Sequence, residues 1–121
     1  MSNLTTVELK TFVPAKDFAR SRDFYQALGF NMPWSDDNMA YLHHGSSSFM
    51  LQKFYVREQA ENFVMHLLVE DVAAWHRHLS EAGVAERFDV RMGELVDQPW
   101  GMREFVLFDP SGVLWHIAQN I

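Results

Sequence analysis

The chain has 121 residues, a formal net charge of −6 with histidine neutral, and no cysteine. This length suits a single domain, and a hydrophobic content of 48% argues against disorder. The lack of cysteine excludes disulfides, thiolate metal sites and cysteine nucleophiles. The acidic balance argues against nucleic acid as a ligand and mildly favours a cation. No apolar run is long enough for a membrane helix, and no signal peptide is visible, so we expect a cytoplasmic protein.

A strand and a helix are the first predicted elements. Residues 7–13 alternate in the manner of a strand. The helix should begin at Asp17, whose carboxylate can accept unpaired backbone N–H groups, and end at Gly29, which adopts left-handed backbone easily. Three short strands should follow, at 30–34, 40–44 and 49–55, with turns at 36–38 and 45–48.

The same order recurs 54 residues later, where Asp71 matches Asp17 and Gly83 matches Gly29. A strand at 63–69 precedes this second helix. Further strands are predicted at 86–90, 93–96, 103–108 and 113–119, with a Pro- and Gly-containing turn at 109–112. The sequence therefore predicts one α+β domain over residues 1–121. It consists of two βαβββ repeats, about 5–57 and 62–121, linked near 59–61.

Two groups of motifs point to a known family. The first comprises Val13 to Phe18, Phe24-Tyr25 and Leu28-Gly29-Phe30; the second comprises Trp100 to Phe105, Phe108 to Gly112 and Gln119-Asn120. Together they resemble the glyoxalase/bleomycin resistance protein/dioxygenase superfamily, also called the vicinal-oxygen-chelate superfamily. The Trp-Gly segment and the Gln-Asn ending are most similar to bleomycin-resistance proteins. The resemblance implies cupped mixed sheets around a pocket and a homodimer, often with exchanged segments. It also implies that a cationic glycopeptide drug binds at the dimer interface without a metal.

The resemblance also identifies where a metal would bind. Metal enzymes of the superfamily hold a divalent ion with four His or Glu side chains, and the corresponding positions here are Lys10, Gln52, Val64 and His116. Lysine is positively charged, valine has no lone pair and glutamine offers a single carbonyl oxygen, so only the histidine is an ordinary ligand. We therefore expect no metal cofactor and no catalytic residue. A divalent metal in an improvised site made of His116, His66, His44 and Glu104 is the alternative.

Aromatic side chains suggest where an organic ligand would bind. Trp100, in a Pro-Trp-Gly turn before a strand, can present its indole at the rim of a pocket, although a tryptophan buried in the core or a dimer interface fits equally well. Glu104 is a carboxylate expected in an apolar cup, where it needs a partner. Trp75 and Trp115 are expected in the core. The predicted ligand-binding set is Trp100, Glu104, His116, His66, Gln52, Phe54, Trp34 and Phe12.

These observations predict a homodimer that binds a small or medium organic molecule, such as a cationic antibiotic of the bleomycin type, without doing chemistry. A ligand unrelated to bleomycin remains open. The alternative is a metal-dependent lyase of the glyoxalase kind or a dioxygenase-like enzyme. In that case the metal would polarise vicinal oxygens or stabilise an enediolate.

Overall fold

The computed structural model describes residues 2–121 and has the predicted α+β architecture. The first half contains β1 (Phe12–Pro14), α1 (Phe18–Leu28), β2 (Asn31–Ser35), β3 (Met39–His44) and β4 (Ser47–Gln52). A short helix, α2 (Arg57–Ala60), leads to the second half. That half contains β5 (Val64–Leu68), α3 (Val72–Glu81), α4 (Val84–Phe88), β6 (Val96–Gln98), β7 (Met102–Phe108) and β8 (Leu114–Asn120). Within residues 2–121, no helix is both long enough and apolar enough to cross a bilayer.

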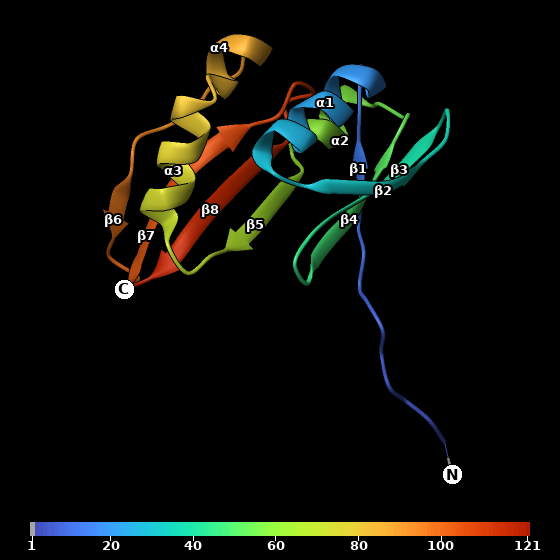
Figure 1. Ribbon diagram of the computed structural model, residues 1–121, viewed down its shortest axis with the longest axis horizontal. Coiled ribbons are helices and arrows are strands. Elements are labelled where there is room, and N and C mark those ends of the chain that lie inside the picture. Colours follow the sequence, from blue (N-terminus) through green and yellow to red (C-terminus); the bar gives the residue numbers. More distant parts are fainter. Residues whose placement is uncertain (1) are drawn as a thin grey trace.

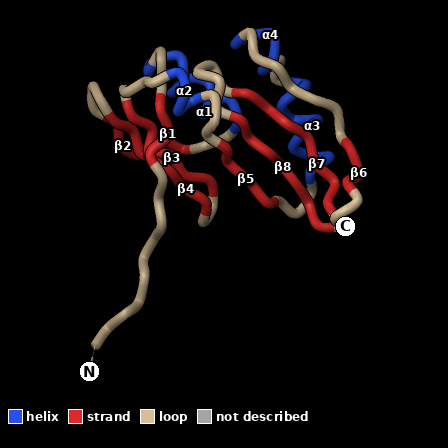
Figure 2. Tube along the Cα trace, turned by 180° about the vertical axis from the view of Figure 1, so that it is seen from behind, coloured by secondary structure: helices blue, strands red, loops and turns tan. Residues whose placement is uncertain are grey.

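Each half folds into its own four-stranded sheet, and the two sheets have the same topology. Their strand orders are β1-β4-β3-β2 and β5-β8-β7-β6. In both, the first strand runs parallel to the last, while the other neighbours are antiparallel. The sheets lie side by side (Figure 1), and the view from behind shows the strands in front of α1 and α3 (Figure 2). The predicted duplication is therefore confirmed at the level of topology.

Both long helices begin at the predicted residues, and α1 ends at the predicted glycine, whereas α3 ends two residues before Gly83. The side chain of Asp17 accepts a hydrogen bond from the backbone N–H of Arg20 at 3.1 Å, and that of Asp71 accepts one from Ala74 at 3.0 Å. Gly29 follows α1 with a φ of 115°, a left-handed conformation that a residue with a Cβ rarely adopts. These local signals fix where each helix enters and leaves its sheet.

One face of each sheet packs against the helices and forms the core. Because side chains alternate along a strand, the residues of β4 and of β7 that face the core recur at every second position. Phe49 and Leu51 of β4 are at most 1% exposed, as are Phe105 and Leu107 of β7. Burying a side chain of this size contributes roughly 1.5–3 kcal/mol, so these positions fix the register of both sheets. The opposite face of each sheet has no helix over it.

A buried hydrogen-bond network joins the two halves. The hydroxyl of Tyr25, on α1, donates to Asp109 Oδ2 at 2.6 Å and accepts from the indole N–H of Trp115 at 3.0 Å. The other carboxylate oxygen of Asp109 accepts the backbone N–H groups of Ser111 and Val113, at 2.8 and 2.9 Å. Burial raises the pKa of Asp109 to about 6, although the bonds from Tyr25, Val113 and Ser111 act in the opposite direction.

The second half differs from the sequence prediction after α3. The strand predicted at 86–90 is wrong, because this stretch belongs to α4 and to the turn after it. Val84 and Phe88 are 0% and 7% exposed, and their spacing of four places both on one helical face. Phe88 meets Phe24 of α1 edge-on, with ring centroids 5.4 Å apart. The next strand lies at 96–98, later than the predicted 93–96.

The first strand is shorter than the alternation predicts. It begins at Phe12, where the pairing with Met50 starts, although β4 extends back to Ser47. We call residues 2–11 the arm: its first residues run away from the domain (Figure 1), whereas Glu8 and Thr11 are hydrogen-bonded to the first sheet. Leu4, Val7 and Leu9 of the arm are 86%, 99% and 94% exposed. Three large apolar side chains on one segment thus lack any cover within the chain.

The buried carboxyl of Asp109 predicts a distinct pH dependence of stability. Its pKa is about 6 in the fold and near 3.8 when unfolded, so the folded state binds the proton more tightly. The resulting stabilisation is complete below the unfolded pKa and is lost as the pH rises through about 6. Relative to Asp109→Asn, the wild-type protein should therefore gain on the order of 2–3 kcal/mol in unfolding free energy between about pH 7 and pH 4.

Urea unfolding of both proteins across this pH range measures the gain. Asp23→Asn, which alters an exposed carboxylate on the same helix α1, is the matched control and should track the wild type. If the difference in unfolding free energy between the wild type and Asp109→Asn stayed constant with pH, the expected dependence on protonation of Asp109 would be contradicted.

Candidate ligand-binding site

Aromatic and thioether side chains form a row across the bare face of the first sheet. The strand register places Phe12 beside Met50, Met50 beside Tyr41, and Tyr41 beside Trp34. Phe12 and Trp34 are each 48% exposed. Gln52 lies one register step along the same face, next to Pro14 and Met39. We call Phe12, Met50, Tyr41 and Trp34 the aromatic row; it offers a flat apolar surface on which a planar ligand can stack.

A charged network borders one side of this row. Glu8, near the base of the arm, accepts hydrogen bonds from the Tyr41 hydroxyl at 2.7 Å and from the Ser48 hydroxyl at 2.8 Å, and it forms an ion pair with Lys10. The bond from Lys10, followed by those from Tyr41 and Ser48, lowers the pKa of Glu8 to about 2. The network ties the base of the arm to the first sheet.

Two histidines and a carboxylate meet on the bare face of the second sheet. His66 on β5 lies beside His116 on β8, with the rings 6.4 Å apart and nearly parallel. His116 Nδ1 is 3.6 Å from Glu104 Oε2 on β7, and Glu104 is only 6% exposed. Half-exposed Val64 and Leu68 flank His66 on the same face. A nearly buried carboxylate beside two imidazoles can bind hydrogen-bond donors or a cationic group of a ligand.

The remaining predicted site residues lie elsewhere. Trp100 is 63% exposed on the turn between β6 and β7, where Asp97 and Arg103 pair through two hydrogen bonds of 2.6 and 3.2 Å. In Figure 1 this turn and β2, which carries Trp34, lie at opposite ends of the molecule. Phe54 is 51% exposed just beyond β4. One chain therefore brings together Phe12, Gln52 and Trp34 on one sheet, and His66, His116 and Glu104 on the other.

Sequence reasoning missed Tyr41 and His43. Both lie on the bare face of β3, and their rings stack with centroids 5.8 Å apart. The alternation of residues 39–44 could have predicted this position. Ala40 and Leu42 are buried on the core side of the strand, so Tyr41 and His43, each one residue further along, lie on the opposite face. The bare face of the first sheet is thus more aromatic than the prediction implied.

Comparison with known proteins identifies the family. The model of the Glyoxalase/Bleomycin resistance protein/Dioxygenase superfamily matches residues 7–117. The chain belongs to this superfamily. It is 30% identical over 115 residues to a bleomycin resistance protein of Klebsiella pneumoniae, covering 89% of this chain and 88% of that protein. The resemblance stated from the motifs is therefore confirmed.

Solved structures of superfamily members share the fold. A bleomycin-binding protein complexed with bleomycin superposes with a TM-score of 0.81 at 26% identity, covering 96% of this chain and 100% of that one. The bleomycin-binding protein of Streptomyces verticillus, complexed with copper(II)-bleomycin, gives a TM-score of 0.81 at 22% identity, covering 98% and 100%. At that lower identity the likeness shows the fold alone.

The superfamily's metal-ligand positions do not suit a metal in this chain. The Lys10 ammonium is bound to Glu8, and Val64 has no donor atom. Gln52 and His116 lie on different sheets. Among residues 2–121, no group of three or more His, Asp or Glu side chains is arranged to hold an ion.

The improvised set of metal ligands is only partly assembled. His66, His116 and Glu104 are neighbours, but His44 lies on the opposite, helix-covered face. There its ring packs 5.9 Å from Phe30 and 5.1 Å from Trp75.

This donor set predicts that the protein purifies without a stoichiometric metal. Protein made without a histidine tag should contain far less than one nickel, zinc, iron or manganese ion per chain by elemental mass spectrometry. His116→Ala, which removes the one ordinary ligand among the four superfamily positions, should leave the metal content unchanged. One tightly bound ion per chain that disappears in His116→Ala would favour the enzyme alternative.

Proposed function

We propose that this protein is a metal-free binding protein that captures an organic molecule of the bleomycin type in the cytoplasm and holds it without chemistry. The observation that carries the proposal is the exposed aromatic row, Phe12, Met50, Tyr41 and Trp34, in a chain whose relatives include bleomycin resistance and bleomycin-binding proteins. Flat, partly exposed aromatic rings bind planar heteroaromatic groups by stacking and cations by cation–π attraction.

The remaining predicted residues supply polarity and a rim. Glu104 and the imidazoles of His66 and His116 form the polar part of the second sheet's face, where they would bind amine and amide groups of the ligand. Gln52 adds an amide beside the aromatic row. The net charge of −6 attracts a cationic ligand over long range. Trp100 and Phe54 would line the rim.

A homodimer completes the site in this proposal. The bare faces of the two sheets carry complementary halves of a ligand site, but β2, which carries Trp34, and the β6–β7 turn, which carries Trp100, lie at opposite ends of the molecule (Figure 1). A second copy would bring the first sheet of one protomer against the second sheet of its partner. The exposed Leu4, Val7 and Leu9 of the arm support this assembly, since apolar side chains at 86–99% exposure gain most from cover by a partner.

Drug binding tests the function directly. Titration of the protein with metal-free bleomycin should show binding at micromolar drug by calorimetry. Trp34→Ala and Trp100→Ala should each weaken binding by roughly 2- to 30-fold, the range expected for losing one aromatic or cation–π contact. Trp75→Phe alters a tryptophan on the helix side of the sheets and is the control.

Two results would count against the proposal. One is the absence of a binding signal at micromolar drug. The other is an equal loss of affinity in the Trp75→Phe control, because the effect would then not depend on the bare faces of the sheets.

Oligomeric state tests the dimer. Light scattering at micromolar concentration should give twice the chain mass of 14.1 kDa. The double variant Leu4→Asp/Leu9→Asp should shift the population toward monomer, because charges on these side chains oppose their burial against a partner. Thr5→Ser in the same segment should not. A wild-type protein that is monomeric under these conditions would contradict the dimer.

A further inference from the structure

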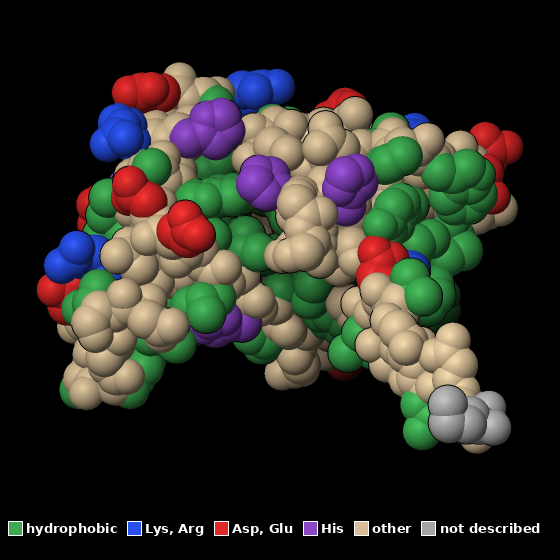
Figure 3. Space-filling model, turned by 60° about the horizontal axis from the view of Figure 1, so that its bottom comes forward, with side chains coloured by type: hydrophobic (Ala, Val, Ile, Leu, Met, Phe, Trp, Pro, Cys, Tyr) green, Lys and Arg blue, Asp and Glu red, His purple; other side chains and the backbone are tan. Residues whose placement is uncertain are grey.

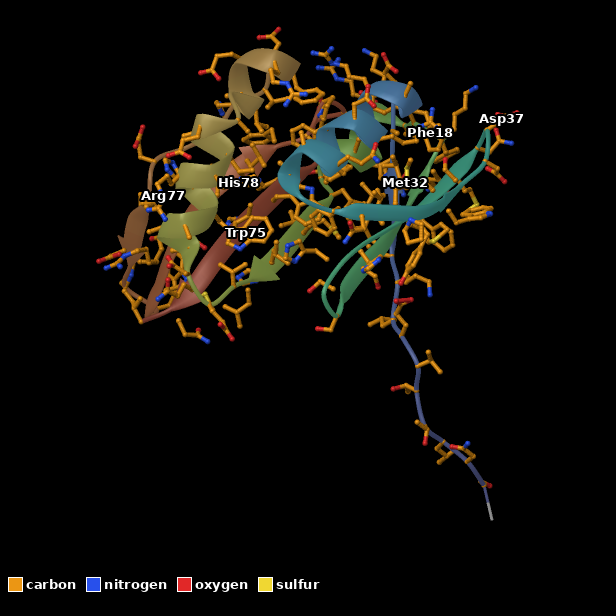
Figure 4. The ribbon with its side chains drawn as sticks, in the orientation of Figure 1. Phe18, Met32, Asp37, Trp75, Arg77 and His78 are labelled. Atoms are coloured by element: carbon orange, nitrogen blue, oxygen red, sulfur yellow. The ribbon has the colours of Figure 1, made fainter. Side chains whose placement is uncertain are left out.

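A second hollow lies on the opposite, helix-covered side of the molecule, at the seam between the two halves. It has a volume of about 370 Å³ and separates the end of α1 from α3. Its lining residues are Leu28, Gly29, His44, Ala74, Trp75 and His78. Figure 3 shows a hollow with apolar side chains inside and histidines at its edge, and Figure 4 shows Trp75 and His78 projecting from α3 into the space between the halves. We call this hollow the seam groove.

An adjoining hollow extends the seam groove toward the sheets. It shares His44, Ala74 and Trp75 with the groove and adds the β3–β4 turn and residues 67–71, with a volume of about 470 Å³. The His44 and Trp75 rings are 5.1 Å apart and inclined by 59°, so they stand where the two hollows meet. Each volume falls within the range of small-molecule sites.

Trp75 gives the groove a flat aromatic wall. Its place on the apolar stripe of the second helix predicts a core residue; Trp75 does pack against the core, but only part of its side chain is buried. By contrast, Val72 and Leu79 on the same helix are completely buried. The halves pack through α1, α4 and the Tyr25–Asp109 contact, and no element covers the outer part of α3 near Trp75. A large aromatic surface is thus left accessible in a concave setting.

The charges around the groove favour a cation. The lining residues of the two hollows, all within residues 2–121, include Glu70 and Asp71 but no lysine or arginine. Asp71 Oδ1 accepts the N–H of Ala74, while Glu70 forms no salt bridge in the described chain. Glu70 and Trp75 line the same adjoining hollow, so a flat cation there gains from both charge and cation–π attraction.

The walls of the groove are held by two turns that need glycine. Gly29 has a φ of +115° and Gly45 a φ of +57°, and the two flank His44 from α1 and from the β3–β4 turn. A Cβ built on Gly29 would lie 3.8 Å from His44 Cδ2, so the imidazole packs directly over this turn. The His44 side of the groove is therefore in place before any ligand arrives, which lowers the entropic cost of binding.

We propose that the seam groove and the adjoining hollow together form a second small-molecule site, which takes a planar aromatic cation with its ring against Trp75 and its charge toward Glu70 of the adjoining hollow. This site is separate from the aromatic row and does not depend on the function proposed for the bare faces of the sheets.

The test uses full-length protein and N-methylquinolinium, a flat aromatic cation, with 2-naphthoate as an anion of similar shape. Titration is followed by amide NMR at about pH 8, where an ordinary histidine is uncharged. The quinolinium should shift the amides of Gly29, Gly45 and Ala74, and the naphthoate should bind more weakly. Trp75→Leu should weaken quinolinium binding by roughly 2- to 30-fold. Glu70→Gln should weaken it severalfold.

Two further variants keep the result specific. Ala74→Leu adds bulk from α3 and should block the groove while leaving the indole in place, so a loss of binding there does not depend on removing Trp75. Asp23→Asn removes an exposed carboxylate on α1 that lines neither hollow, so it is the matched control for Glu70→Gln and should bind the quinolinium as the wild type does. Circular dichroism should verify that each variant is folded.

Three outcomes would overturn the proposal. The first is unchanged affinity in both Trp75→Leu and Ala74→Leu. The second is a set of shifts confined to the Tyr41 and Trp34 face. The third is binding that appears only after residues 2–9 are deleted, because the arm of a second copy would then be the occupant of the groove.

Discussion

The hydrogen bond from Tyr25 to Asp109 is the contact on which the arrangement of the two halves depends. It joins α1 of the first half to the β7–β8 turn of the second, and the same carboxylate closes that turn through Ser111 and Val113. A buried carboxylate without these donors would be costly, so the turn, the helix and the network stabilise one another. The backbone N–H of Lys16 adds a second link by donating to the Ser111 hydroxyl at 2.8 Å.

With the halves joined in this way, each sheet has one face that no helix covers. The helices cover the side on which Tyr25 and Trp115 are buried, so the aromatic row and the His66–His116–Glu104 group remain on the uncovered side. The halves are joined through α1 and the β7–β8 turn, and the space beside α3 stays open. The bare faces and the seam groove are therefore two consequences of one packing arrangement, in which the core lies between the helices and only one face of each sheet.

Much of the fold could be predicted because its signals are local. The capping residues Asp17 and Asp71, the left-handed Gly29 and the alternation in β4 and β7 each depend on a few neighbouring residues, and the motifs pointed to the superfamily. The predictions failed where packing against residues far away in the sequence determines the structure. Val84 and Phe88 suit either a strand or a helix until Phe24 is placed against them. The extent to which Trp75 is buried likewise depends on the position of the first half.

The candidate site was predictable residue by residue but not as an assembly. Periodicity places His66, His116 and Glu104 on strands, but only the register shows that they share a face, and that His44 does not. Tyr41 was missed because the alternation of its strand was not followed to the opposite face. The location of Trp100 relative to Trp34 depends on how the two repeats are arranged, which one repeat's sequence cannot determine.

The ionic contact of Glu8 has a consequence for how the arm can move. Since Tyr41, Ser48 and Lys10 hold this carboxylate and keep its pKa near 2, acidification to about pH 3 would leave it charged and attached. The residues before Glu8 make no such contact with the first sheet. At roughly 3.3–3.6 Å per residue, the six residues 2–7 span about 20 Å, which is the greatest distance that they can reach from this anchor toward a neighbouring molecule.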